Sequence, residues 1–311
     1  MALDRPLKIG TRGSPLALAQ TRTVRDRLIA ENPGLSEEDV TIEVFKTRGD
    51  RITDRKLLEI GGKGLFTEEL EEALKTGMLD MAVHSMKDMP TTLPDDLEIP
   101  CYLERVDPRD ALIAREGTSI AGLKPGAVVG TASLRREAQL RHARPDLNVV
   151  TFRGNVGTRL KKLDAGEADA TLLACAGLMR LGMMEVATAT LSVDEMMPAP
   201  AQGAIGIECR SDRDMIRHLL APLNHRPTAR ALAAERALLA GLDGSCRTPI
   251  AALATLDGDR LYLRARLLSP DGTQCFETER TGSATDGAAL GADAAAELRA
   301  AAGPGFMAAL A

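Results

Sequence analysis

The chain has 311 residues, and at roughly 150 residues per domain this length predicts two or three domains. Charged residues make up 27% and hydrophobic residues 44%, a balance that excludes a disordered or collagen-like chain. The 39 basic residues against 44 acidic ones give a net charge of −5, and aromatic residues are only 2%, with no tryptophan. This composition is not typical of a nucleic-acid binder.

The first residues and the cysteines indicate the compartment. Asp4, Arg5 and Lys8 place charges near the start of the chain, and no run approaches the roughly 18 apolar residues of a membrane-spanning helix. We therefore expect a cytoplasmic protein with no membrane partner. The five cysteines form no CxxC pair, and the four histidines show no HxH or HExxH spacing. Neither a disulfide framework nor a structural or catalytic metal is predicted.

Strand-like and helix-like segments alternate up to about residue 220. The predicted strands are 7–10, 40–46, 79–86, 111–115, 127–133, 148–154, 168–177 and 201–210. Ser14 and Ser133 look like helix N-caps, and Pro15 suits the first helical position. Further helices are predicted over 66–77, 156–167 and 212–221. This rhythm predicts α/β domains with largely parallel sheets, whose strand ends are the usual place for ligands.

The pattern changes after residue 222. One long helix is followed by three alternating strands with Asp-Gly turns between them, and then by an alanine-rich helix. The corresponding ranges are 226–244, 248–256, 260–268, 274–282 and 285–311. This order predicts a separate α+β domain.

Basic residues concentrate in one stretch of the sequence. Residues 131–162 contain eight lysines and arginines against Glu137 and Asp146, a local charge of +6. Several of these arginines fall where a strand meets a helix N-terminus, a position that favours anions. We expect ligand contacts from Arg12, Arg135, Arg136, Arg153 and Arg159, and solvated positions for Arg141, Arg144, Lys161 and Lys162. The expected ligand is a small polyanion in a cleft between two α/β domains.

The segment HSMKDMP, residues 84–90, follows a predicted strand and places Ser85, Lys87 and Asp88 in one turn. A carboxylate beside a lysine stays ionised easily, so Asp88 is a candidate for stabilising a developing cation or moving a proton. The alternative is a turn-capping aspartate beside a surface lysine. The glycine-rich segment 61–70 precedes a helix but lacks the phosphate-binding GxxxxGK[ST] spacing.

Cys246 lies in the loop sequence LDGSCRTP, directly after a predicted helix C-terminus. That end of a helix does not favour a thiolate, which makes Cys246 a poor nucleophile for repeated turnover. A covalent attachment made once suits it better. The alternative is an incidental loop cysteine.

Nine segments, in order, resemble those of the porphobilinogen deaminase (hydroxymethylbilane synthase) family over nearly the whole chain. They are TRGSPLALAQ, GGKGLFTEELE, AVHSMKDMP, DPRDALI, GTASLRREAQL, FRGNVGTRLKKLDAGE, AGLMRLG, PAPAQGAIGIECR and LDGSCRTPI. The resemblance implies an α/β fold of two domains similar to solute-binding proteins plus a smaller C-terminal α+β domain. The implied ranges are 1–103 with 197–221, then 104–196, and 222–311.

The resemblance also implies a transferase of porphyrin, haem and other tetrapyrrole biosynthesis that condenses four porphobilinogen molecules into hydroxymethylbilane and releases ammonia. The cofactor of the family is a dipyrromethane attached by a thioether to a loop cysteine, and that cysteine matches Cys246. The catalytic aspartate of the family matches Asp88. One departure is Ser245, which stands where a glycine is expected, and a stiffer loop is one expected consequence. We expect a monomer that binds no nucleic acid and no metal.

Further site residues follow from the matching motifs. The implied cofactor-binding residues are Lys63, Ser85, Lys87, Ser133, Arg135, Arg136 and Arg159, and the implied substrate-binding residues are Arg12, Ser14, Arg153, Arg180 and Gln202. Two other functions stay open: a two-lobed protein that binds an anion reversibly, and a nucleic-acid binder that uses residues 131–162. The second is weakened because Phe152 is the only aromatic residue in that stretch.

Overall fold

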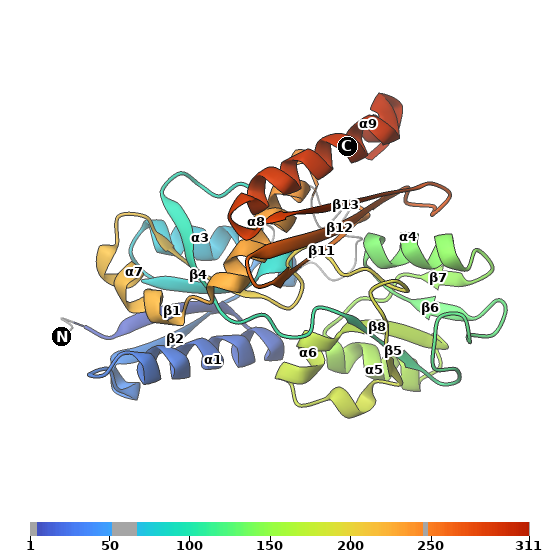
Figure 1. Ribbon diagram of the computed structural model, residues 1–311. Helices are drawn as coiled ribbons and strands as arrows, with labels where there is room; N and C mark the ends of the chain where they lie inside the picture. The colour runs from blue at the N-terminus through green and yellow to red at the C-terminus, as the bar shows by residue number, and fades with distance from the viewer. Residues whose placement is uncertain (1–4, 52–66, 245–247, 311) are drawn as a thin grey trace. The chain divides into compact units, whose positions relative to one another are not determined.

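A computed structural model describes residues 5–51, 67–244 and 248–310 (Figure 1). Lys63, Ser245 and Cys246 lie outside the described residues, as does most of the glycine-rich segment. The chain divides into two compact units. The first unit comprises 1–55, 61–106 and 204–229, and the second comprises 56–60, 107–203 and 230–311.

The first unit contains a five-stranded sheet in the order β2-β1-β3-β10-β4. Its strands are β1 (Leu7–Arg12), β2 (Val40–Phe45), β3 (Met81–Ser85), β4 (Leu97–Tyr102) and β10 (Ile205–Arg210). Strands β2, β1 and β3 are parallel, whereas β10 runs antiparallel to both β3 and β4. The side chains of Met81 and Ala82 therefore belong to opposite faces of this sheet.

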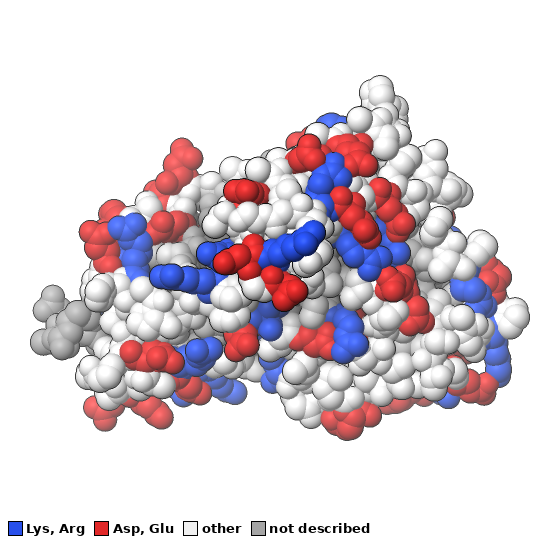
Figure 2. All heavy atoms as spheres, in the orientation of Figure 1, with Lys and Arg blue, Asp and Glu red and all other residues white. Residues whose placement is uncertain are grey.

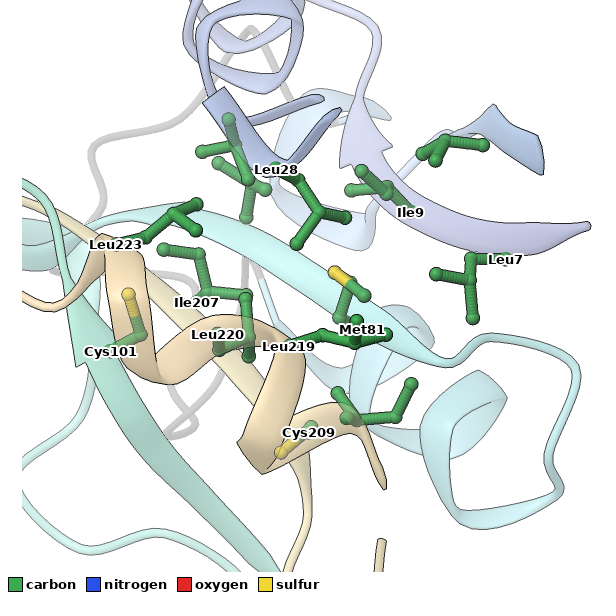
Figure 3. Close-up of a cluster of buried hydrophobic side chains, with 14 of the residues drawn as sticks. Leu7, Ile9, Leu28, Met81, Cys101, Ile207, Cys209, Leu219, Leu220 and Leu223 are labelled. Carbon is green, nitrogen blue, oxygen red and sulfur yellow. The ribbon is translucent and has the colours of Figure 1, made fainter. Parts of the chain in front are cut away.

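Helices cover both faces of that sheet. Figure 3 shows Leu7, Leu28, Met81 and Leu220 in one buried cluster, which joins α1 (Pro15–Glu31) and α7 (Asp214–Leu220) to one face. On the other face, α3 (Glu68–Lys75) packs against Ala82. The unit also contains the short helix α2 (Arg48–Arg51) and the single-turn helices η1 (Glu37–Asp39), η3 (Met86–Asp88) and η5 (Ala221–Leu223). Burying a leucine fully is worth about 1.5–3 kcal/mol, so these clusters hold the ends of β1 and β3 in place.

The second unit contains two sheets. The larger has the order β7-β6-β8-β5-β9, formed by β5 (Asp110–Ala114), β6 (Val128–Gly130), β7 (Asn148–Val150), β8 (Ala170–Ala174) and β9 (Ala189–Thr190). Helix α4 packs on one face, and α5 and α6 pack on the other. These helices span Leu134–Ala143, Val156–Asp164 and Cys175–Arg180.

The smaller sheet of this unit is an antiparallel meander. It consists of β11 (Ile250–Asp257), β12 (Arg260–Leu268) and β13 (Cys275–Ser283), with α8 (Arg226–Gly241) and α9 (Gly287–Leu310) packed on it. Glycines with positive φ, Gly258 and Gly272, turn its hairpins at the two predicted Asp-Gly pairs. None of the helices in the described ranges is both long and apolar enough to cross a membrane.

The predicted fold class, two α/β domains with a smaller C-terminal α+β domain, is confirmed. The prediction of largely parallel sheets was wrong in part, because β10 and β5 run antiparallel to both of their neighbours. The predicted strand 168–177 ends at Ala174 and continues as helix α6, while β4 and β9 were missed. The three predicted domain ranges stay a prediction.

Candidate active site

A small pocket lies in the first unit where the parallel strands β1 and β3 end. It has a volume of 70 Å³, and Arg12, Ser14, Gln20, Ser85 and Asp88 contribute to its lining. Ser14 caps α1 there, since its side chain accepts a hydrogen bond from the Ala17 amide at 3.2 Å. The pocket thus combines a helix N-terminus and an arginine, both of which favour an anion, with one carboxylate.

Gln20 fixes the position of Ser85 in this pocket. Its amide Nε2 donates to Ser85 Oγ at 2.8 Å, and the side chain is buried in the inward face of α1. The sequence analysis missed Gln20. The sequence signal for Gln20 is a polar residue on the otherwise apolar face of a predicted helix, because a buried side-chain amide requires a hydrogen-bond partner.

Asp88 lies on the single-turn helix η3 that directly follows β3. The turn is anchored to the residue before β10, because the Met86 amide donates to the Ala204 carbonyl at 3.1 Å. Gly206 makes this close approach possible, since a Cβ there would come within 2.2 Å of Met86 Sδ. Asp88 and Lys87 are half-buried, so the carboxylate of Asp88 is held at the pocket and remains accessible.

The second unit contains a buried group of charges centred on Asp110. Arg135 Nη2 and Arg136 Nη2 each donate to the Asp110 carboxylate at 2.8 Å, and Gln202 Nε2 donates to it at 2.8 Å. Burial alone raises the pKa of Asp110, but the two guanidinium groups outweigh it and hold that pKa well below its usual range. The sequence analysis did not single out Asp110 as the partner of these arginines.

Ser133 and Arg180 hold the backbone around this group. Ser133 Oγ accepts from the Arg136 amide at 3.5 Å and caps α4, as predicted. Arg180 Nη2 donates to the Gly203 carbonyl at 2.7 Å, next to the residue where the chain enters the first unit. Burial lowers the pKa of Arg180 to about 10.

Arg153 and Arg159 add positive charge to this group. Burial and then the repulsion of Arg136 and Arg153 lower the pKa of Arg159 to about 10. Among the residues that the structure describes, Asp110 is the carboxylate that forms ion pairs with Arg135 and Arg136, and no such pair is found for Arg153 or Arg159. Arg159 thus lies close enough to Arg136 and Arg153 for their positive charges to repel one another.

Some donors in this group are unused. Arg153 Nη1 and Arg135 Nε are buried and have no hydrogen-bond partner among the described residues. An unsatisfied buried donor costs about 1–3 kcal/mol, and guanidinium donors fit carboxylates well. The second unit is therefore suited to binding an anion with several carboxylates.

Comparison with known proteins identifies the family. The model described as "Porphobilinogen deaminase, dipyromethane cofactor binding domain" matches residues 7–218, and "Porphobilinogen deaminase, C-terminal domain" matches residues 229–300. The chain belongs to the porphobilinogen deaminase family. The family and cofactor predicted from the sequence are thereby confirmed.

Relatives within the porphobilinogen deaminase family match almost end to end. The porphobilinogen deaminase of Paracoccus denitrificans is 57% identical over 296 residues, covering 95% of this chain and 94% of that protein. The chloroplastic enzyme of Oryza sativa is 55% identical over 304 residues, covering 96% of this chain and 85% of that protein.

A more distant likeness is to the ligand-binding component of an ABC-type import system from Staphylococcus aureus. It has a TM-score of 0.40 and 10% identity, and it covers 77% of this chain and 75% of that one. The fold class itself rests on the strand orders given above.

The described residues fit the family's cofactor. A dipyrromethane made from porphobilinogen units carries acetate and propionate groups, and the unused guanidinium donors of Arg135 and Arg153 are suited to such carboxylates. Arg136 uses three of its five N–H groups on Asp110 and the Leu172 carbonyl, so two remain. Cys246, the predicted point of attachment, is outside the described residues, and this assignment stays a prediction.

Proposed function

We propose that this chain condenses four porphobilinogen molecules head to tail, with loss of ammonia, into hydroxymethylbilane, and that Asp88 is the residue at the reacting ring. Membership of the porphobilinogen deaminase family supports the reaction, which makes the chain a transferase of tetrapyrrole biosynthesis. The observation that carries the assignment of Asp88 is its place in a pocket that Arg12 and Ser14 also line.

Asp88 acts electrostatically in this proposal. Loss of ammonia from the aminomethyl group leaves positive charge that spreads into the pyrrole ring. The carboxylate of Asp88 accepts a hydrogen bond from the pyrrole N–H and stabilises that charge in a partly buried site, where electrostatic interactions are stronger than in water. Arg12 and Ser14 bind the carboxylates of the incoming porphobilinogen and orient its ring.

The remaining predicted residues bind carboxylates. When bound through Cys246, the dipyrromethane supplies the free pyrrole carbon to which each new unit is joined. We assign its carboxylates to the residues that the family motifs match, namely Lys63, Ser85, Lys87, Ser133, Arg135, Arg136 and Arg159. Arg153, Arg180 and Gln202 are assigned to the substrate. The excess of buried positive charge near Arg153 and Arg159 supports this assignment.

The test is the substitution Asp88→Asn, which keeps the shape of the side chain and removes its charge. Release of ammonia from porphobilinogen is expected to fall by about 100-fold or more, while the mass of the purified chain still includes the dipyrromethane. Asp95→Asn, an exposed aspartate on the following loop, is the matched control and leaves the rate unchanged. An Asp88→Asn protein that releases ammonia at the wild-type rate contradicts the assignment.

A cytoplasmic, monomeric state without nucleic-acid or membrane partners completes the proposal. The four cysteines Cys101, Cys175, Cys209 and Cys275 are free, in keeping with a reducing compartment. Arg135 and Arg136 are each only 5% exposed, so they do not form an open basic surface of the kind that a nucleic-acid backbone covers. On the face shown in Figure 2, acidic and basic side chains are interspersed.

A further inference from the structure

His84 and Glu208 form a buried acid–base pair in the first unit that the proposed function leaves unused. His84 Nε2 lies 2.8 Å from Glu208 Oε2. Glu208 is fully buried on β10, and His84, on β3, is 6% exposed. Both belong to the face covered by α3, because His84 is opposite Gly206 and Glu208 is opposite Ala82 in the antiparallel pairing.

This pair reaches the pocket of Asp88. His84 and Thr67 line the pocket together with Asp88, Ser85 and Arg12. A carboxylate can only accept a hydrogen bond, so Nε2 donates whenever Glu208 is ionised, and the lone pair of the imidazole is then on Nδ1. A histidine oriented in this way by a carboxylate is suited to accepting a proton.

Glu71 of α3 is a second acidic residue beside the pair. Glu208 Oε1 and Glu71 Oε1 are both buried and have no hydrogen-bond partner in the described part of the chain. Burial raises the pKa of Glu71, a hydrogen bond from Thr67 lowers it, and the nearby charge of Glu208 raises it further. Glu71 of α3 interacts electrostatically with His84 and Glu208, and also with Lys75, while Asp88 lines the same pocket as His84.

Stability alone does not account for such a pair. Removing a carboxylate from water costs several kcal/mol, and apolar side chains of similar volume would fill the same space at least as well. His84 also lines the pocket that contains Asp88. The pair is therefore a candidate for proton transfer in the pocket.

The condensation needs such a group. The C–N bond of the porphobilinogen ammonium breaks and its electron pair leaves on ammonia, while a C–C bond forms with a π pair from the acceptor ring. The hydrogen on the attacked α-carbon then leaves as a proton, and the C–H pair restores the aromatic ring. Because Asp88 accepts the pyrrole N–H at this stage, a separate base in the same pocket can take that proton while Asp88 keeps its negative charge.

We propose that His84, oriented by Glu208, accepts the α-proton from the attacked pyrrole ring at Nδ1. This inference rests on the proposed function and adds a second residue to its chemistry. A protonated His84 can also return a proton to the free α-carbon of the terminal ring. We therefore expect the ring bound to the enzyme to exchange its α-hydrogen with solvent even when no porphobilinogen is present.

The experiment measures that exchange. Wild-type enzyme carrying its cofactor is incubated in D2O without porphobilinogen, and deuterium in the cofactor is measured by mass spectrometry after digestion. His84→Gln keeps a side-chain N–H for Glu208 but cannot accept the proton, and exchange is expected to slow by about 100-fold. His218→Gln replaces an exposed histidine of α7 and exchanges at the wild-type rate.

A second variant and a second measurement guard against a folding defect. Glu208→Gln keeps the size of the side chain and is expected to slow exchange by about 10-fold, because the imidazole loses the carboxylate that orients it and stabilises its charge. With porphobilinogen deuterated at its free α-carbon, the isotope effect on chain extension is expected to rise from near one in the wild type to about three in His84→Gln. A structural role for His84 would slow every step and leave this isotope effect near one.

The outcomes separate this inference from the proposed function. If the wild type releases no ammonia from porphobilinogen, the proposed function fails, and the role of His84 fails with it. If the wild type releases ammonia but both variants exchange the α-hydrogen at the wild-type rate, only the role of His84 is overturned. Slow exchange together with a raised isotope effect supports both.

Discussion

Replacing Asp110 with asparagine tests whether the buried arginines of the second unit depend on one carboxylate. Asp110 is 0% exposed and accepts hydrogen bonds from Arg135, Arg136 and Gln202. Asp110→Asn keeps its shape, but it leaves two guanidinium groups buried at 5% exposure without a negative partner. Removing one partner of a buried ion pair costs about 3–5 kcal/mol.

A loss of stability of this size is large enough to measure as a fall in the melting temperature, Tm. In domains of 150–250 residues, each kcal/mol lowers Tm by about 2–4 °C, so Asp110→Asn is expected to lower Tm by about 10 °C in scanning calorimetry. Asp146→Asn is the control, because Asp146 pairs with Arg144 at the surface and exposed pairs contribute little. An Asp110→Asn protein that melts within about 2 °C of the wild type would refute the reasoning.

The pH dependence of stability follows from the same residue. The folded protein holds the pKa of Asp110 below its ordinary value of 3.8. A carboxyl group with a lowered pKa contributes its full stability above the ordinary value and loses it as the pH falls through the folded value. The wild type is therefore expected to lose stability below about pH 4 more steeply than Asp110→Asn does, as measured by Tm against pH.

Three further predictions concern packing, charge and the pocket. Gly272→Ala is expected to lower the free energy of unfolding by about 2 kcal/mol or more. The φ of Gly272 is +75°, and a Cβ there would lie 2.6 Å from the amide nitrogen of His142 in α4. Gly258 has a φ of +55° but open space around it, so Gly258→Ala is expected to lower the free energy of unfolding by less than Gly272→Ala does. Arg153→Gln is expected to raise Tm, because it relieves buried repulsion, and to raise KM for porphobilinogen; a lower Tm would contradict this. Gln20→Leu removes the amide that holds Ser85 and is expected to raise KM several-fold, since one hydrogen bond is worth about 0.5–1.5 kcal/mol; an unchanged KM would contradict the role of Gln20.

Local features of the fold were predictable from the sequence. Ser14 and Ser133 cap their helices as predicted, because a cap depends on residues three positions away. The Asp-Gly turns also depend on adjacent residues only. In contrast, the apolar segment 168–177 was predicted as one strand although it turns into a helix at Cys175. Hydrophobicity alone does not separate a short buried strand from a buried helix.

Long-range features of the site were not predictable in the same way. Asp110 meets Arg135 from 25 positions away, and Gln20 meets Ser85 from 65 positions away. The antiparallel direction of β10 depends on the route by which the chain returns from the second unit, which no local pattern encodes. The sequence did predict that Asp88 follows a strand at a turn, because the break after that strand is local.

The most direct test of the account is the intact mass of the chain during a reaction with limiting porphobilinogen. The wild-type chain is expected to start with the mass of a dipyrromethane attached at Cys246 and then to gain pyrrole units one at a time. Cys246→Ala shows no added mass, and Asp88→Asn keeps the starting adduct without extending it. A wild-type chain that forms hydroxymethylbilane while its own mass stays at that of the bare polypeptide would contradict the account.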